Sequence, residues 1–335
     1  MLKSLIIVSL SCFGIFAFSQ NGDYSKINVV SSASIFQDMA KEIGGDYIHS
    51  QCIVPIGGDP HIYEPKPSDV TLLKEADIIL INGLTFEGWI YKIIENSGTN
   101  AKVVLITEGI QPIQSTTYHN ASDPHAWMDA TNGLVYASNI KKAIVDVLPE
   151  AADEIQKRYY KYISDLIDLD KYIVNRINEI PAEKRVLITS HDAFAYYGKR
   201  YGLQLNALKG ISTEAETQTS DMVRIAEAIK QSGVPAIFIE STINPKVIQQ
   251  IATDNGVKVG GELFADSIGD EDSDAPTYLT MLKHNTDVIV DALTDTQDRL
   301  TKIDSDNKKY NTYIYLTIGF IMIGGLAYVV INLNQ

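Results

Sequence analysis

The chain is poor in cysteine and in basic residues. Only two of its 335 residues are cysteines, and one of them, Cys12, lies in the apolar segment at the start. Once that segment is removed, Cys52 has no partner for an intramolecular disulfide. The 28 Lys and Arg residues are outnumbered by 42 Asp and Glu residues, which gives a formal net charge of −14. So acidic a chain lacks the basic face of a nucleic-acid-binding protein, and we expect no nucleic-acid partner.

The first nineteen residues have the composition of a secretory signal. Lys3 is their only charge, and the apolar run that follows ends in Ala17-Phe18-Ser19. Small residues at positions −3 and −1 fit cleavage after Ser19, so we predict a signal peptide at residues 1–19 and a periplasmic or other extracytoplasmic protein. A lipidated Cys12 and an uncleaved anchor are the alternatives.

A second uncharged run stands near the other end, at residues 313–331. Nineteen helical residues cover about 28 Å, close to the thickness of the hydrocarbon core of a bilayer. We predict a transmembrane helix there, preceded by a polar tether at residues 301–312. A buried core helix is the alternative.

Between the ends, β-branched runs alternate with amphipathic stretches, as in α/β proteins. The alternation occurs twice, so we predict two Rossmann-like lobes, residues 20–148 and 182–300, each with a parallel sheet covered by helices. The expected strands are 27–30, 47–54, 77–82, 102–107, 185–190, 203–208, 235–241 and 257–263. The expected helices are 33–43, 67–76, 86–96, 193–201, 219–233 and 244–256.

Residues 149–181 join the two patterns and differ from both. Pro149 suits a first helical turn, glycine is absent, and apolar residues recur at helical spacing from Ile155 to Ile177. We predict one long helix of about 45 Å that joins the lobes rigidly. Coiled-coil pairing is the alternative for such a stripe.

Histidine is rare, with six residues, yet two histidines occur in the same tripeptide: Asp59-Pro60-His61 and Asp123-Pro124-His125. Proline stiffens each turn and keeps the aspartate close to the histidine. A carboxylate in that position is a natural partner for an imidazole that binds a metal.

Two further candidates follow expected strands of the second lobe. His191 comes directly after residues 185–190, and Asp266 follows residues 257–263. His61 also follows a strand, and ligands of open parallel sheets gather beyond the carboxyl ends of strands. Three imidazoles and one carboxylate from two lobes suit a divalent ion such as zinc. For His49, His119 and His284 we expect no such role.

Five segments then resemble a known family: GGDPHIYEPKPSDV, DPHAWMD, TSHDAFAYYGKRYGL, FIESTINPK and LFADSIG. They are similar, in order, to the signature segments of the zinc- and manganese-binding solute-binding proteins of ABC metal-uptake transporters, the cluster A-I family. The resemblance covers residues 28–293. It implies a monomeric exported receptor that passes its ion to an ABC permease.

Residue by residue, the resemblance implies that His61, His125, His191 and Asp266 bind the metal. It gives supporting roles to Asp59, Asp123 and Glu240.

The third ligand position bears on the choice of metal. In the family a histidine there goes mostly with zinc and a glutamate with manganese or iron, and this chain has His191. We therefore predict Zn²⁺, with Mn²⁺ or iron as the alternative, in line with the preference of manganese for oxygen ligands. The chain departs from many zinc-specific relatives because it lacks a long His-rich loop. It departs from nearly all relatives in its predicted C-terminal membrane anchor.

An enzyme is the alternative from another class. Three protein ligands and a water form a catalytic zinc site, and Glu64 would be its general base. Four protein ligands close such a site, so we predict that the chain is not an enzyme.

Overall fold

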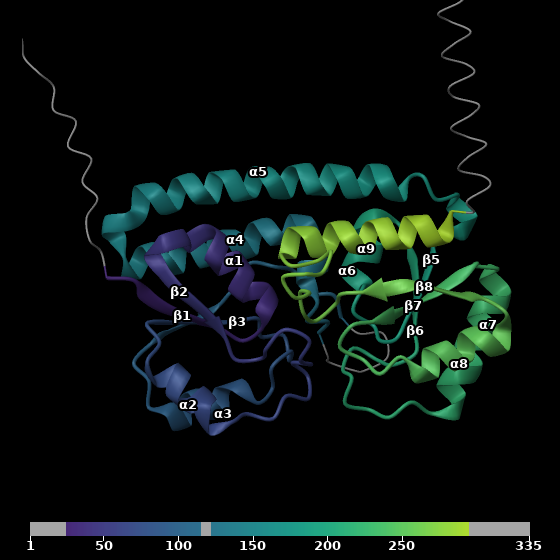
Figure 1. Cartoon of the computed structure of the whole chain (residues 1–335), viewed down its shortest axis with the longest axis horizontal. Coiled ribbons are helices and arrows are strands. Elements are labelled where there is room, and N and C mark those ends of the chain that lie inside the picture. Colours follow the sequence, from purple (N-terminus) through teal and green to yellow (C-terminus); the bar gives the residue numbers. More distant parts are fainter. Residues whose placement is uncertain (1–24, 115–121, 295–335) are drawn as a thin grey trace, which may run out of the picture.

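The computed structural model describes residues 25–114 and 122–294 (Figure 1). The predicted signal peptide (1–19), tether (301–312) and membrane helix (313–331) lie outside these residues, as do Cys12 and His119. Within the described part of the chain, none of the helices combines the length and the apolar character needed to cross a bilayer.

The first half of the chain forms one four-stranded sheet in the order β2-β1-β3-β4. All three strand pairs are parallel, and β3 is buried along its whole length. The strands are β1 (Ile27–Ser31), β2 (Ile48–Cys52), β3 (Ile78–Ile81) and β4 (Lys102–Leu105). The prediction of an α/β fold with parallel strands is confirmed.

In the second half the strands form two hydrogen-bonded pairs that lie beside each other, instead of the single continuous sheet that we predicted. The pairs are β5 (Val186–Thr189) with β6 (Gln204–Ala207), and β7 (Ala236–Glu240) with β8 (Lys258–Leu263). Both pairs are parallel.

A bulge interrupts the pairing of β7 with β8, where Gly260 and Gly261 lie opposite a single residue of β7. A Cβ on Gly261 would come within 2.6 Å of Val288, and one on Gly260 within 2.7 Å of Ala292. Glycine at both positions therefore lets a helix of the second half, α9 (Tyr278–Leu293), pack closely against β8.

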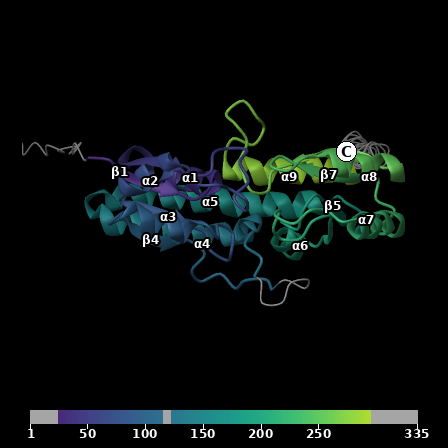
Figure 2. The same ribbon diagram turned by 90° about the horizontal axis from the view of Figure 1, so that it is seen from below.

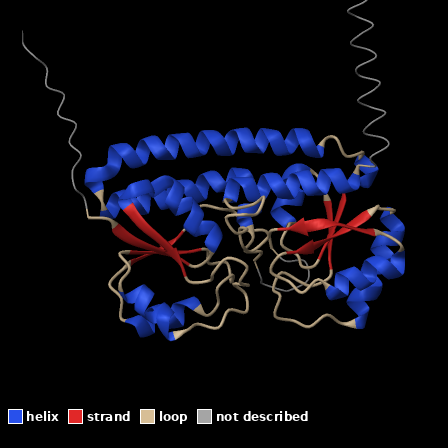
Figure 3. Cartoon of the chain, viewed as in Figure 1, coloured by secondary structure: helices blue, strands red, loops and turns tan. Residues whose placement is uncertain are grey.

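Nine α-helices of the described residues surround the strands (Figure 3). They are α1 (Ser34–Gly44), α2 (Pro67–Lys74), α3 (Ile90–Ser97), α4 (Ala130–Val147), α5 (Ala152–Ile177), α6 (Ala195–Tyr201), α7 (Thr219–Ser232), α8 (Lys246–Asn255) and α9 (Tyr278–Leu293). The sequence pattern did not predict α4.

Helix α5 runs along both halves of the molecule (Figure 1). Figure 2 shows α1 and α9 on one side of it and α4 and α6 on the other, and α5 contacts all four. Its buried residues recur at helical spacing, from Ile155 through Leu166 to Ile177. One apolar stripe thus packs against helices of both halves, and the sheets lie beneath this layer.

Candidate metal centre

Four predicted side chains converge where the two halves meet. Each of His61, His125, His191 and Asp266 offers an atom that lies within 4.8 Å of the atoms offered by the other three. All four lie in loops that follow parallel strands, namely β2, β4, β5 and β8. Two side chains come from each half, so the cluster bridges the halves.

The distances within the cluster fit a single small cation. The Nε2 atoms of His61 and His125 are 3.2 Å apart, and Asp266 lies 3.4 Å from Nε2 of His125, 3.3 Å from Nε2 of His191 and 3.8 Å from Nε2 of His61. Ligand atoms about 2.1 Å from a tetrahedral zinc ion lie about 3.4 Å from one another. The cluster therefore needs little rearrangement to surround an ion.

Two imidazoles are fixed by carboxylates in the same way. Oδ1 of Asp123 accepts a hydrogen bond from the backbone N–H of His125 (2.9 Å) and lies 2.7 Å from its ring Nδ1. Glu240 accepts from the backbone N–H of His191 (2.8 Å), and its other oxygen lies 2.5 Å from Nδ1. Each carboxylate occupies Nδ1, so Nε2 of both rings points into the cluster.

Asp59 holds the backbone of His61 and not its imidazole ring. Its Oδ1 accepts from the backbone N–H of His61 (2.9 Å), which fixes the turn. Its Oδ2 accepts from the hydroxyl of Thr213, in the second half (2.6 Å).

The centre of the cluster is closed to solvent and has polar atoms without partners. His125, His191 and Asp266 are 0% exposed. Nε2 of His191 and both carboxylate oxygens of Asp266 make no hydrogen bond among the described residues, and their contacts within the cluster are ion pairs at 3.3 Å or more. Buried polar atoms without partners are costly, and a cation would satisfy all three at once.

Charge and burial act against each other in the site. Burial lowers the pKa of His61 to about 3, helped by the neighbouring histidines and opposed by Asp266. Burial also lowers the pKa of His125 and His191, but neighbouring carboxylates outweigh it: Asp123 and Asp266 raise the pKa of His125 to about 9, and Glu240 and Asp266 raise that of His191. Burial raises the pKa of Asp266, yet His191 and His125 hold it well below its usual value.

Aromatic side chains that the sequence did not single out form one wall of the site. The ring of Phe86 meets that of His61 edge to face at 5.1 Å and lies 4.7 Å from the ring of Trp127, which lies 5.3 Å from His125. Phe86 and Trp127 are fully buried. They keep water from two imidazoles and restrict their rotation.

The turn that presents Phe86 has an unusual backbone. Gly83, Leu84 and Thr85 all have positive φ, at 71°, 53° and 70°. Buried Glu87 holds this turn, because its carboxylate accepts from the backbone N–H groups of Asn82 (2.6 Å) and Gly83 (3.0 Å).

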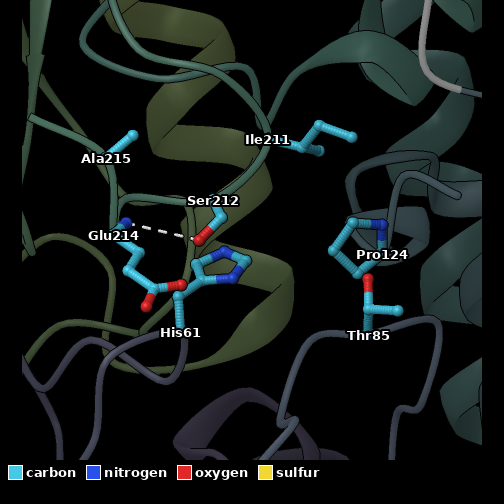
Figure 4. A pocket seen from close by; sticks show the side chains of 7 residues that line it. All are labelled: His61, Thr85, Pro124, Ile211, Ser212, Glu214 and Ala215. Carbon is cyan, nitrogen blue, oxygen red and sulfur yellow. Dashed lines mark hydrogen bonds between the residues drawn. The ribbon is translucent and has the colours of Figure 1, made fainter. Parts of the chain in front are cut away.

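A cavity of about 440 Å³ reaches the cluster at His61 (Figure 4). Its walls come from both halves: His61, Thr85 and Pro124 from the first, and Ile211, Ser212 and Glu214 from the second. Sequence patterns gave no sign of the second wall, which lies in the connection between β6 and α7.

Other residues considered from the sequence lie apart from the cluster. His49 is exposed on β2, and Glu64 is exposed in the loop before α2. His284 lies on α9, where its Nε2 is 3.2 Å from the carbonyl oxygen of Glu262.

The chain matches the family model of the periplasmic zinc-uptake complex component A (ZnuA) over residues 29–292. It is 33% identical to the metal ABC transporter substrate-binding lipoprotein SsaB of Streptococcus sanguinis, over 82% of this chain and 91% of that protein. It is also 33% identical to the manganese-binding lipoprotein MntA of Halalkalibacterium halodurans, over 82% and 90%. Among solved structures, the periplasmic zinc-binding protein TroA of Treponema pallidum is 34% identical, with a TM-score of 0.77 over 81% of this chain and 100% of that one.

Proposed function

The chain belongs to the family of the periplasmic zinc-uptake complex component A, the substrate-binding proteins of metal ABC transporters, and on this premise we propose that it captures one divalent cation outside the cytoplasm and delivers it to an ABC permease. Members of this family are solute-binding receptors and not enzymes, so the metallohydrolase alternative is wrong. The cation is cargo, which the receptor must bind tightly and later release.

We assign the cation to His61, His125, His191 and Asp266. The observation that carries this assignment is the convergence of one ligand atom from each residue to within 4.8 Å of the others, with both oxygens of Asp266 and Nε2 of His191 buried and not hydrogen-bonded. Supporting roles fall to Asp123 and Glu240, which orient two of the imidazoles.

Zinc is the cargo that this donor set favours. Three imidazole nitrogens and one carboxylate form a borderline shell, whereas manganese prefers oxygen, and zinc stands above manganese in general affinity. Relatives bear both names: MntA is called manganese-binding, and TroA is called zinc-binding. Manganese is therefore the alternative cargo.

Metal binding by variants tests the assignment. We expect the wild-type chain to retain one Zn²⁺ per molecule in equilibrium dialysis, and Asp266→Ala and His191→Ala to retain far less. His284→Ala, which removes a histidine outside the cluster, is the matched control and should bind as the wild type does. A wild-type chain that binds no metal would refute the receptor function.

Competition between metals tests the choice of cargo. With equal concentrations of Zn²⁺ and Mn²⁺, metal analysis of the wild type should find zinc, and His191→Glu should shift the occupancy toward manganese because it replaces a nitrogen by oxygen. A wild type that takes up mainly manganese would overturn the zinc preference and leave the receptor function intact.

We further propose that residues 20–148 and 182–300 act as two lobes and residues 149–181 as their rigid connector. The separate sheets of the two halves and the length of α5 support this division.

Attachment to the membrane forms a separate part of the proposal. The relatives named above are called lipoproteins or periplasmic proteins, whereas the sequence of this chain favours a helix at residues 313–331. Fractionation of cells that express a chain ending at residue 300 tests this anchor, with Cys12→Ala as the comparison. If Cys12→Ala detaches from the membrane and the shortened chain does not, the anchor is a lipid on Cys12 and not the helix.

A further inference from the structure

The connection between β6 and α7 belongs to the second half and contacts the first half at the mouth of the metal centre. We call residues Lys209–Glu216 the gate segment. Ile211, Ser212 and Glu214 of this segment form one wall of the cavity that reaches His61, and Thr85 and Pro124 lie opposite (Figure 4). A cation that uses this cavity passes between the gate segment and the first half.

The first two residues of the gate segment, Lys209 and Gly210, form its stem and are hydrogen-bonded to the residues on either side of His191. The backbone N–H of Lys209 donates to the carbonyl oxygen of Ser190 (2.9 Å), and that of Asp192 donates to the carbonyl oxygen of Gly210 (3.2 Å). The stem therefore stays with the second half.

The tip of the segment is tied to the turn that presents His61. Buried Thr213 donates its hydroxyl to Oδ2 of Asp59 (2.6 Å), while Oδ1 of the same carboxylate accepts from the backbone N–H of His61 (2.9 Å). Nζ of Lys209 donates to the carbonyl oxygen of Thr213 (2.7 Å) and holds the tip in shape. One carboxylate thus fixes a metal-site turn and the gate segment together.

The bond from Thr213 to Asp59 has no counterpart elsewhere in the gate segment, as far as the described residues go. Among the described residues, the hydroxyl of Thr213 makes the only hydrogen bond between the gate segment and the first half. Loss of that bond would remove the tie between the tip and the first half and would leave the four clustered side chains in place.

We propose that Thr213 is a positioning residue that latches the gate segment to Asp59 and thereby sets the rate at which the cation enters and leaves. The inference rests on the proposed function, because it concerns access to the same four side chains. The latch is present with the four side chains already gathered, so its loss speeds entry and release together and changes the affinity less than either rate.

Release kinetics test the latch. Wild-type protein and Thr213→Val are loaded with Zn²⁺ and mixed rapidly with an excess of a chromogenic chelator. We expect Thr213→Val to release zinc roughly five-fold faster, as the loss of one hydrogen bond to a partly exposed carboxylate predicts. Thr213→Ser keeps the hydroxyl and should release zinc at nearly the wild-type rate.

Thr217→Val is the matched control, because it makes the same substitution four residues along the connection, where Thr217 lines a different cavity beside Lys246. Its release rate should equal that of the wild type. Equal rates for Thr213→Val and the wild type, or equal acceleration by Thr217→Val, would overturn the latch.

The association rate separates the remaining outcomes. If Thr213→Val weakens zinc binding as much as it speeds release, with an unchanged association rate, Thr213 stabilises the bound state and is not a latch. A wild type that binds no zinc refutes the proposed function itself, whereas a binding wild type with no kinetic effect of Thr213→Val refutes only the latch.

Discussion

The two sides of the metal centre are joined in different ways. At the front, beside a cavity, one hydrogen bond from Thr213 to Asp59 joins the gate segment to the first half. At the rear, beneath α1 and α9, buried groups make a chain of contacts that we call the rear contacts.

The rear contacts begin at Asp38 on α1, which accepts a hydrogen bond from the backbone N–H of Tyr278 at the start of α9 (2.8 Å). The hydroxyl of Tyr278 donates to the carbonyl oxygen of Trp127, and the indole N–H of Trp127 donates to that of Ala265 (2.8 Å). Ser34 and Ser267 add a hydroxyl contact at 3.1 Å.

The difference assigns separate tasks to the two sides. Buried hydrogen bonds in a packed core are costly to break, because the groups left behind find no water. A bond beside a cavity breaks more easily, because water replaces the lost partner. We therefore expect the rear to hold the loops of the four clustered side chains in register, and the front to control access to them.

The largest effect is expected at the rear, from Trp127→Ala. Trp127 is fully buried and contacts Phe36 and Phe86, so its removal leaves a large void and should cost about 3–5 kcal/mol of unfolding free energy. Urea unfolding of the metal-free chain measures it, since bound metal would add its own stabilisation. Ile211→Ala at the front borders an existing cavity and should cost about 2 kcal/mol, the low end for a buried isoleucine. Equal losses for the two variants would contradict the comparison.

A buried carboxylate makes the rear sensitive to pH. Burial raises the pKa of Asp38 to about 6, with Glu42 acting in the same direction and the Tyr278 N–H and Lys41 against it. The folded state therefore holds this proton more tightly than the unfolded chain, and the wild type loses stability as the pH rises from about 4 to about 6.

Asp38→Asn should remove that loss, because an amide oxygen still accepts from the Tyr278 N–H but carries no charge. At pH 7 we expect the variant to gain up to about 3 kcal/mol relative to the wild type, and nothing near pH 3.5. Urea unfolding of both proteins over this pH range gives the difference. Parallel pH profiles would show that Asp38 does not titrate as inferred.

Removal of one hydroxyl on each side compares the two sides directly. Tyr278→Phe leaves the buried carbonyl oxygen of Trp127 without its donor and should cost about 1–3 kcal/mol. Thr213→Val frees a carboxylate that water can reach, and should cost less than about 1 kcal/mol. Thermal unfolding of the two metal-free variants compares their losses of stability. A larger loss for Thr213→Val than for Tyr278→Phe would mean that the front joins the halves more tightly.

Local sequence patterns predicted much of the fold and the cluster. The alternation of strands and helices needs only neighbouring residues, and the two Asp-Pro-His turns carry their carboxylates within two positions of each histidine. His191 and Asp266 were predicted because they follow strands, and the ends of parallel strands meet at one edge of a sheet.

The rest depends on contacts between distant residues. Thr213 and Asp59 are 154 positions apart, and Asp38 and Tyr278 are 240 apart, so no local pattern marks either pair. The division of the second sheet into two hydrogen-bonded pairs likewise depends on tertiary packing. Glu240 was identified only through the family resemblance, because it contacts His191 from 49 positions away in the sequence.

The smallest effect that we expect is the change in overall shape when the metal binds. Rear contacts and α5 join the two halves, so metal binding should move the gate segment and not rotate one half against the other. Small-angle scattering of the chain with and without Zn²⁺ should give the same radius of gyration within error. A clear compaction on binding would mean that the rear contacts form only around the metal, and the division of tasks between front and rear would then be wrong.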